Sequence, residues 1–494
     1  MPEERTLAEL GLRAQGGREA RVAGLALDSR KVGRGFLFAA LPGHGGHGAA
    51  HAGAAVAAGA AAVLTDADGA RIAGDALGDV PVVLAEDARA AFARTCALWF
   101  GPGPETVVAV TGTNGKTSVA SFARQIWAAL GHRAINLGTV GVEGAWEAPL
   151  GHTTPDSVTL HRVLAEARAA GVTHAAMEAS SHGLDQRRMD GVWLAAAGWT
   201  NLTQDHLDYH GDMESYFRAK ARLFEALLPP DGVAVINLDD PAGARVAAIA
   251  AARGQEVIGT GAAEGARLRL LGQRFDATGQ EMRFAWQGAA RQVRLELVGG
   301  FQAANALVAA GLCIGAGEEP EAVFRALSCL ETVRGRMQLA ARRANGAAVF
   351  VDYAHTPDAV ETALRALRPH VMGRIVAILG AGGDRDRTKR PLMGAAAARG
   401  ADAVIVTDDN PRSEDPAAIR AAILEGVRAA GGEAQEVGDR AEAILRGVDA
   451  LGPGDALLIC GKGHETGQVV GGVVYPFDDR EQASVSVAVL EGRA

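Results

Sequence analysis

TVVAVTGTNGKTS, residues 106–118, joins a short run of β-branched and apolar residues to a glycine-rich turn. Residues 106–111 predict a buried strand, and residues 116–130 predict a helix that ends before Gly131. A strand, a glycine-rich turn and a helix in this order are typical of a phosphate-binding loop, because the helix N-terminus carries partial positive charge. The segment therefore predicts a nucleotide site within an α/β domain.

The residue types in this loop match the chemistry of phosphate binding. Gly112 and Gly115 allow backbone N–H groups to approach phosphate oxygens closely. Lys116 can reach the β- and γ-phosphates, and the hydroxyl of Thr117 can ligate Mg²⁺. The common motif has its first glycine where this chain has Val110, so the loop is a shortened variant, but a plain turn would not need the Lys-Thr pair. The expected nucleotide contacts are Gly112, Thr113, Asn114, Gly115, Lys116, Thr117 and Ser118.

Apolar runs alternate with helical segments after this loop. Residues 173–180, 195–201 and 232–237 predict buried strands, and residues 213–228 predict a helix that is ended by two prolines. This alternation predicts a parallel sheet with helices on both faces. Residues 268–298 differ, because three runs of alternating polarity predict an antiparallel meander.

A second α/β pattern begins near Gly335. Its predicted strands are residues 347–352, 374–380, 401–407 and 455–460, and they are followed by YAHTPD, AGGDRDRTKR, DDNPR and GKGHE. Ligands of open α/β sheets bind outside the carboxyl ends of the strands. These four loops therefore predict one wall of a binding site.

Composition sets limits on the class of protein. The 494 residues correspond to three domains of about 150 residues each. The net charge of −9 disfavours a protein that binds duplex nucleic acid, and the 5% aromatic content disfavours a surface that stacks bases. The four cysteines lie far apart without CxxC spacing, so they fit neither a zinc site nor a disulfide framework.

The sequence also predicts a cytoplasmic location. The first residues, MPEERTLAEL, lack the basic and apolar regions of a signal peptide. Residues 35–65 carry no Asp, Glu, Lys or Arg, but their glycines, histidines and Pro42 make them too weakly apolar for membrane insertion. Reduced cysteines agree with the cytosol.

Motifs spread along the chain together resemble those of the Mur ligase family. They are TGTNGKTS, MEASSHGLDQRR, NLTQDHLDYHG, AKARLF, GRM, VDYAHTPD, GGDRDRTKRPLMG, DDNPR and GKGHE. The resemblance extends from Leu27 to Glu465 and favours the members of the family that add diaminopimelate. It implies a three-domain α/β protein: an α/β domain for the UDP-linked substrate (1–101), a central ATPase domain (102–335) with a parallel sheet and a small antiparallel meander, and a Rossmann-like amino-acid-binding domain (336–494).

The resemblance also implies a reaction. ATP would drive amide formation between meso-diaminopimelate and the D-Glu γ-carboxylate of UDP-MurNAc-L-Ala-D-Glu, in the synthesis of peptidoglycan precursors. A carboxylate has no usable leaving group, so transfer of the γ-phosphoryl group would first create an acyl phosphate. The expected partners are these small molecules and two Mg²⁺ ions, without nucleic acid or membrane insertion, and the expected state is a monomer.

Two candidate metal ligands join Thr117. Glu178 ends the predicted strand 173–180, where the residues alone leave a metal ligand and a capping or salt-bridged glutamate equally open. His206 shares its turn with Asp205, Asp208 and His210. The resemblance assigns Mg²⁺ to Glu178 and the second metal to His206.

Lys220 lies in ESYFRAKARLFEAL, where a lysine on an amphipathic helix is usually a solvated cation. The resemblance instead implies that CO₂ converts it to N6-carboxylysine, a carbamate that helps to hold the second Mg²⁺. Such a reaction requires a neutral amine, so we expect burial or nearby cations to lower the pKa of Lys220. The expected catalytic residues are Lys116, Glu178, His206 and Lys220.

The resemblance assigns three further groups of contacts. Those to the UDP-MurNAc-dipeptide are Leu27, Ser29, His44, Gly45, Gly46, Thr153, Thr154, Ser180, Gln186 and Arg188. Those to ATP, besides the phosphate loop, are Asn305, Arg336, Asp352 and His355. Those to diaminopimelate are Arg385, Asp409, Asn410, Pro411, Arg412, Gly461 and Glu465. The chain departs from the family at Gln302, where Asn is frequent, and at Gln338, where Glu is frequent.

Two of these assignments have simpler explanations. Ser29 could cap a turn, and Arg412 could form a surface salt bridge with Glu414 or Asp415. We prefer binding for Arg412, because diaminopimelate has a distal carboxylate that lysine lacks and the DNPR sequence is typical of the diaminopimelate-adding members. Arg385 would be a second cation, and Gly461 with Glu465 would take the distal ammonium.

Other classes of protein share parts of this pattern. A P-loop switch or motor ATPase would explain GTNGKTS but not the loops of the C-terminal domain. A folylpolyglutamate synthetase shares the ATPase core but lacks the DNPR and GKGHE pair. An inactive binding protein is disfavoured by the joint presence of Lys116, Thr117, Glu178, His206 and Lys220.

Overall fold

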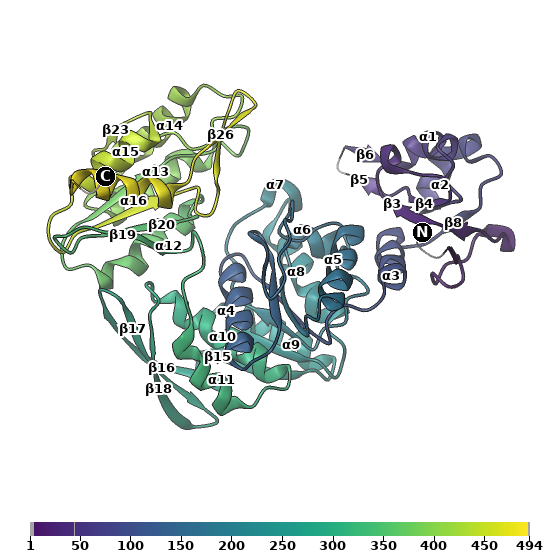
Figure 1. Ribbon diagram of the computed structural model, residues 1–494, viewed down its shortest axis with the longest axis horizontal. Helices are drawn as coiled ribbons and strands as arrows, with labels where there is room; N and C mark the ends of the chain where they lie inside the picture. Colours follow the sequence, from purple (N-terminus) through teal and green to yellow (C-terminus); the bar gives the residue numbers. More distant parts are fainter. Residues whose placement is uncertain (1–3, 44, 493–494) are drawn as a thin grey trace.

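The computed structural model describes residues 4–43 and 45–492. Its main sheets have four, ten and six strands and follow one another along the chain. Figure 1 shows the N-terminal domain in purple at one end, the C-terminal domain in yellow and green at the other, and the central domain between them. The three-domain α/β fold predicted from the sequence is confirmed.

The N-terminal sheet is parallel and has the strand order β3-β4-β7-β8. Its elements are β3 (Gly24–Ala26), β4 (Phe36–Ala39), α1 (Ala52–Ala57), β7 (Ala62–Thr65), α2 (Ala67–Ala73), β8 (Val82–Leu84) and α3 (Ala88–Phe100). No helix of the described ranges is long and apolar enough to cross a bilayer. Helix α3 is capped at its C-terminus by Gly101 and packs against α5 (Ser157–Ala169) of the central domain.

The central sheet has the order β11-β10-β12-β9-β13-β14-β15-β16-β17-β18. Its strands are β9 (Thr106–Thr111), β10 (Ala134–Gly138), β11 (Gly141–Gly144), β12 (His174–Glu178), β13 (Ala196–Trp199), β14 (Val233–Asn237), β15 (Glu256–Gly261), β16 (Leu268–Asp276), β17 (Gly279–Trp286) and β18 (Ala289–Leu295). The predicted antiparallel meander is β16–β18. It extends the central sheet, because β16 also pairs in parallel with β15.

Helices cover both faces of this sheet. They are α4 (Lys116–Ala129), α5 (Ser157–Ala169), α6 (Ser181–Asp185), α7 (Leu207–His210), α8 (Met213–Arg222), α9 (Gly243–Ala252), α10 (Phe301–Gly315) and α11 (Pro320–Ala326). The predicted helix 213–228 is α8 followed by a π-helical turn, Leu223–Leu227, that ends before the two prolines.

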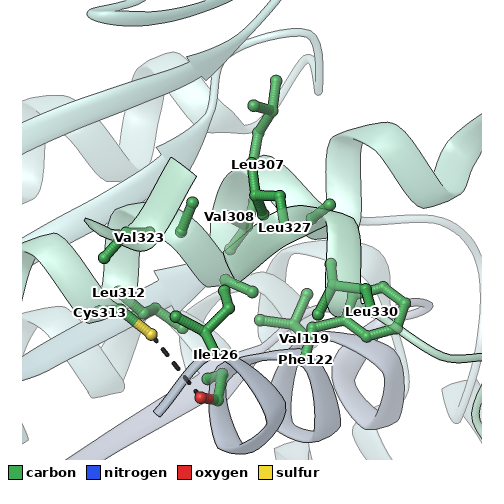
Figure 2. Packing of buried hydrophobic residues seen from close by; sticks show 14 of the residues in the cluster. Val119, Phe122, Ile126, Leu307, Val308, Leu312, Cys313, Val323, Leu327 and Leu330 are labelled. Carbon is green, nitrogen blue, oxygen red and sulfur yellow. Dashed lines mark hydrogen bonds between the residues drawn. The ribbon is translucent and has the colours of Figure 1, made fainter. Parts of the chain in front are cut away.

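Alternate residues of β9 pack into two separate hydrophobic cores on opposite faces of the sheet. Val108 and Val110 belong to the core beneath α4 and α10, whereas Val107 and Ala109 belong to the core on the opposite face. Figure 2 shows side chains of α4 and α10 packed together in the first of these cores. A strand that is buried on both faces is typically apolar throughout, which explains why TVVAVT has no polar alternation.

The C-terminal sheet has the order β19-β20-β24-β21-β22-β23. Its elements are β19 (Gln338–Arg342), β20 (Ala348–Asp352), α12 (Pro357–Leu367), β21 (Ile375–Leu379), α13 (Lys389–Gly400), β22 (Ala403–Val406), α14 (Pro416–Ala429), β23 (Gln435–Glu436), α15 (Arg440–Asp449), β24 (Ala456–Cys460) and α16 (Asp479–Leu490). The four predicted strands are β20, β21, β22 and β24 and are parallel, as expected. The sequence missed the antiparallel edge strand β19 and the hairpin of β25 (Gly467–Val470) and β26 (Val473–Pro476).

The four cysteines are free, as the sequence predicts. Cys96, Cys313 and Cys460 are buried, and Cys329 is exposed.

Candidate active site

The phosphate loop requires glycine at two positions. Gly112 has φ +147° and Gly115 has φ +87°, a region that other residues rarely adopt. A Cβ at Gly112 would lie 1.9 Å from the hydroxyl of Thr200, and one at Gly115 would lie 2.5 Å from Oδ1 of Asn305. The segment that follows β13 holds the backbone of the loop, because the N–H of Thr113 donates to the Asn201 carbonyl at 2.8 Å. These contacts preform the turn at the carboxyl end of β9.

Two lysines converge on one carbonyl of this loop. Lys116 Nζ donates to the carbonyls of Gly112 and Thr113 at 2.9 and 2.8 Å, and Lys220 Nζ donates to the same Gly112 carbonyl at 2.7 Å. Lys220 is only 1% exposed, so it is not the solvated cation that its helix pattern usually indicates. Burial, followed by the charge of Lys116, holds the pKa of Lys220 well below its ordinary value. Burial also lowers the pKa of Lys116.

Glu178 lies beside the hydroxyl of Thr117. The Thr117 hydroxyl donates to Glu178 Oε2 at 3.0 Å, and the N–H of Thr139 donates to Oε1 at 2.8 Å. Glu178 is 2% exposed and ends β12, the neighbour of β9 in the sheet. A hydroxyl and a carboxylate oxygen at this separation are ligands that Mg²⁺ prefers, so these residues fit the ion that the sequence predicts.

His206 belongs to a cluster of aromatic side chains next to the loop. Its ring lies 4.8 Å from that of His182 and 6.3 Å from that of Tyr216, measured between centroids. Burial lowers the pKa of His206, and burial followed by the charge of His206 lowers the pKa of His182 to about 4. His206 also has φ +53°, a strained conformation that proteins retain mainly at functional sites.

Residues after the last central helix approach the loop from the C-terminal domain. The guanidinium of Arg336 lies 4.6 Å from the ring of Tyr353, and Nη2 donates to the Thr117 hydroxyl at 3.4 Å. Asp352 accepts from the N–H groups of Met337 and Ala354 at 2.6 and 2.8 Å, and burial raises its pKa. Thus Arg336 and Asp352 are fixed near the phosphate loop by separate contacts.

The remaining predicted nucleotide contacts lie on the same side. His355 Nδ1 pairs with the Tyr353 carbonyl at 2.9 Å, and burial followed by Lys389 lowers the pKa of His355. Asn305 donates to Gln302 Oε1 at 3.0 Å, so this departure from the family orients the neighbouring amide. The other departure, Gln338, accepts from the N–H of Gly335 at 2.9 Å.

A cleft of about 530 Å³ separates the N-terminal and central domains. The residues that line it include predicted contacts to the UDP-MurNAc-dipeptide: Leu27, Gly45, Gly46, Gln186 and Arg188. His44 lies outside the described residues. Ser29 does not line the cleft as described; it begins a short 3₁₀ turn that Asp28, and not Ser29, caps.

The predicted dipeptide contacts connect this cleft to Glu178. Thr154 donates to the Glu178 carbonyl at 2.8 Å and accepts from the N–H of Ser180 at 3.0 Å. The Thr153 hydroxyl lies 3.0 Å from that of Thr139, which itself contacts Glu178. Arg188 donates to the Thr154 carbonyl at 2.6 Å and to Gln186 Oε1 at 2.7 Å. The structure thus brings Thr153, Thr154, Ser180, Gln186 and Arg188 into one continuous path.

The DNPR and GKGHE loops form a second polar network at the carboxyl edge of the C-terminal sheet. Asn410 Nδ2 donates to Glu465 Oε2 at 2.8 Å, and the fully buried Lys462 Nζ donates to both side chains, at 3.2 and 3.1 Å. A Cβ at Gly461 would lie 2.4 Å from Asp409 Oδ2, so this glycine is required for the close approach. Glu465, expected to take an ammonium, already binds that of Lys462.

Arg412 does not form the surface salt bridge considered as an alternative. Its Nη1 donates to the Gly383 carbonyl at 2.7 Å, while Glu414 pairs with Arg387 and Arg390 and Asp415 caps α14. Arg412 has φ +51° and follows Pro411, which is buried. Arg385 is exposed on the neighbouring loop.

Four residues of this region were missed by the sequence analysis. Thr139 contacts Glu178, His182 contacts His206, Lys462 joins the two amino-acid loops, and Asp358 of α12 contacts the phosphate loop. The predicted motifs contain His182, Asp358 and Lys462, so their position in SSHG, HTPD and GKGHE was the available signal.

Comparison with known proteins gives three family matches. The model described as "Mur ligase family, catalytic domain" matches residues 21–94, "Mur ligase middle domain" matches 110–313, and "Mur ligase, glutamate ligase domain" matches 335–463. These matches follow the order of the three main sheets.

Individual relatives are similar over nearly their whole length. A UDP-N-acetylmuramoyl-L-alanyl-D-glutamate–2,6-diaminopimelate ligase of Caulobacter vibrioides is 53% identical over 478 residues, covering 95% of this chain and 96% of the relative. The protein of the same name from Bradyrhizobium diazoefficiens is 50% identical over 475 residues, covering 94% and 95%. A solved structure of a ligase with this name is 34% identical, has a TM-score of 0.71 and covers 99% of this chain and 100% of its own. With its three domains matched in order and relatives of this identity over nearly the whole chain, the protein belongs to the Mur ligase family.

Proposed function

We propose that this chain is the ATP-dependent ligase that joins meso-diaminopimelate to the γ-carboxylate of D-Glu in UDP-MurNAc-L-Ala-D-Glu. The reaction forms an amide bond in a peptidoglycan precursor and takes place in the cytoplasm. The carboxylate attacks the γ-phosphorus of ATP to give an acyl phosphate and ADP, and the amine then displaces inorganic phosphate. The named relatives, at about half identity, support the same activity.

The observation that carries this proposal is the meeting of the carboxyl edges of two parallel sheets. Asp358, near the start of α12, accepts from Asn114 Nδ2 of the phosphate loop at 3.4 Å and from the Thr203 hydroxyl at 3.2 Å. The DNPR and GKGHE loops leave the same edge of the C-terminal sheet as α12. An ATP phosphate and an amino acid can therefore be held in one space, as ligation requires.

Charge stabilisation at the nucleotide end follows from the residues already described. Lys116 supplies a cation at the helix N-terminus, where the transferring phosphoryl group carries its negative charge. Thr117 and Glu178 are the proposed Mg²⁺ ligands, and His206 with Lys220 as its carbamate would hold a second ion. Bound Mg²⁺ neutralises phosphate charge.

The lowered pKa of Lys220 supports its carboxylation. The amine that attacks CO₂ must be neutral, and burial beside Lys116 favours that form. The carbamate would carry negative charge near Lys116, so the like-charge repulsion between the two lysines would become an attraction.

Substrate selection is assigned to the other two domains. We propose that the UDP-linked substrate occupies the cleft between residues 1–101 and 102–335, with Arg188 facing an anionic group. Residues 336–494 take diaminopimelate. Arg412 and Arg385 bind its distal carboxylate, Asp409, Asn410 and Pro411 shape the pocket, and Gly461 with Glu465 face its ammonium.

The test is ADP release by the purified full-length protein with UDP-MurNAc-L-Ala-D-Glu and diaminopimelate, L-lysine or L-ornithine. Diaminopimelate should be preferred by up to about 10⁴-fold in kcat/KM, because lysine leaves the arginines without their carboxylate. Equal use of lysine would refute the assignment. Folate with glutamate serves as a further substrate pair, and turnover of that pair would favour the folylpolyglutamate synthetase.

A further inference from the structure

Two histidines and a glutamate meet at the amino edge of the central sheet, away from the phosphate loop. His132 follows α4, His174 is the first residue of β12, and Glu318 follows α10. One ligand atom of each lies within 4.8 Å of the others. Glu178 is at the opposite end of β12, about 13 Å away at the usual rise of a strand. The cluster is therefore separate from the proposed ligation site.

The geometry directs both imidazoles at one carboxylate oxygen. Glu318 Oε1 lies 3.0 Å from His132 Nε2 and 3.6 Å from His174 Nε2. The two rings lie beside each other, with centroids 4.0 Å apart. Three elements that are distant in sequence thus present two nitrogens and one oxygen to the same small volume.

A neighbouring hydroxyl orients one of the rings. His174 Nδ1 lies 2.8 Å from the hydroxyl of Thr173. When Nδ1–H donates to that oxygen, Nε2 keeps its lone pair and faces Glu318. Protein metal sites use such contacts to fix the tautomer and the direction of a ligating histidine.

The three side chains are partly shielded from solvent. The side chains of His132, His174 and Glu318 are 34%, 12% and 17% exposed. The more exposed side chain of His132 leaves a route by which an ion can reach the cluster.

We propose that His132, His174 and Glu318 bind a divalent transition-metal ion, preferentially Zn²⁺, that ties α4, β12 and α10 together. Two imidazole nitrogens and a carboxylate oxygen form a donor set that suits Zn²⁺, whereas Mg²⁺ prefers oxygen ligands such as those at Thr117 and Glu178. The four cysteines take no part in this site. The ion stabilises the fold and is separate from the Mg²⁺ of ligation.

Zinc titration of the metal-stripped, full-length protein in excess Mg²⁺ tests this proposal. Isothermal titration calorimetry gives the affinity, and Co²⁺ in place of Zn²⁺ gives a visible absorption band when histidines coordinate it. The variants Glu318→Gln and His132→Ala should each lose more than the about 10- to 100-fold in affinity that removal of an outer contact costs. Both should also lose the rise in melting temperature that zinc gives the unaltered protein.

Two histidine variants control for other sites. His152→Ala alters an exposed histidine, and His206→Ala disrupts the second histidine cluster. Both should keep the zinc affinity of the unaltered protein. Circular dichroism checks that each variant is folded, and His132→Ala, at a partly exposed position, gives the result if Glu318→Gln does not fold.

The proposal is overturned if the unaltered protein binds no zinc in excess Mg²⁺. It is also overturned if Glu318→Gln and His132→Ala bind zinc as tightly as the unaltered protein, or if the His206→Ala substitution abolishes zinc binding. Those results would mean that only hydrogen bonds join the three side chains, or that zinc binds at the other cluster.

Discussion

Two buried lysines, Lys220 beside the phosphate loop and Lys462 between the amino-acid loops, have different surroundings. Lys220 Nζ contacts one backbone carbonyl and lies 4.6 Å from the ring centroid of Tyr216, and within the described part of the chain it forms no ion pair. Lys462 Nζ donates to Asn410, Glu465 and the Gly467 carbonyl. Burial without an ion pair lowers the pKa of Lys220 and favours its neutral amine, whereas hydrogen bonds to two side chains and a carbonyl hold Lys462 in place.

From this difference we infer that the two regions have different roles, one in phosphoryl transfer and one in the selection of the amino acid. We propose that the region around Lys220 carries out the phosphoryl transfer, which would serve any amino-acid substrate. The region around Lys462 fixes the direction of Asn410 and Glu465, which would serve one substrate. Substitutions in the first region should therefore reduce turnover, and substitutions in the second should change selectivity.

Lys116→Ala should have the largest effect. It removes the cation at the N-terminus of α4, and loss of one preorganised charge stabiliser usually lowers kcat by about 10²- to 10³-fold. Steady-state ADP release and thermal melting measure activity and folding. Lys31→Ala, at an exposed lysine, is the matched control and should behave as the unaltered protein. Near-normal turnover by Lys116→Ala would contradict the nucleotide assignment.

Lys220→Ala should lower kcat by about 10²-fold, because it removes the carbamate proposed near the metal. Short carboxylic acids should restore part of the activity by occupying the vacated space. The same acids should not restore Lys116→Ala, which makes that variant the control. Absence of rescue, together with a folded Lys220→Ala, would count against the carbamate.

Arg412→Ala should raise the KM for diaminopimelate by about 10- to 100-fold, the usual cost of a hydrogen bond to a charged group. The KM for lysine should change little, so the ratio of kcat/KM for diaminopimelate to kcat/KM for lysine should fall. The KM values for ATP and the UDP-linked substrate should stay within error, because other domains are proposed to bind them. Arg365→Ala, at an exposed arginine of α12, is the control. An unchanged preference would refute the role of DNPR.

Lys462→Met should have the smallest effect on turnover. It leaves polar groups of Asn410 and Glu465 without their buried partner, which costs about 1–3 kcal/mol of unfolding free energy. Denaturant unfolding should show this loss, and the KM for diaminopimelate should rise less than in Arg412→Ala. A variant with unchanged stability and KM would show that Lys462 does not position the two loops.

The sequence predicted those parts of the molecule that depend on local pattern. The strand–turn–helix of residues 106–130 and the four parallel C-terminal strands follow from apolar runs and glycines that are close together in the chain. The position of Glu178 at the end of a strand also follows from local pattern, whereas its assignment as a metal ligand came from the family resemblance and remains a prediction. Local pattern was sufficient in these cases because each element is buried by its own neighbours.

Other features depend on contacts between distant residues. The burial of Lys462 depends on Asn410, 52 positions away, and the contact of Thr139 with Glu178 depends on the pairing of β10 with β12. The periodicity of apolar residues along the sequence does not indicate which distant residues come into contact. Strand β19 and the hairpin β25–β26 were missed because they are short and none of their residues is buried, so burial imposes little pattern on them.

The most direct test of the division between the two regions is exchange of labelled ADP into ATP. The assay contains ATP, Mg²⁺ and UDP-MurNAc-L-Ala-D-Glu but no diaminopimelate, so it reports reversible acyl phosphate formation alone. We expect Arg412→Ala to exchange label at the rate of the unaltered protein and Lys116→Ala to exchange no label. Loss of exchange in Arg412→Ala, or normal exchange in Lys116→Ala, would contradict it.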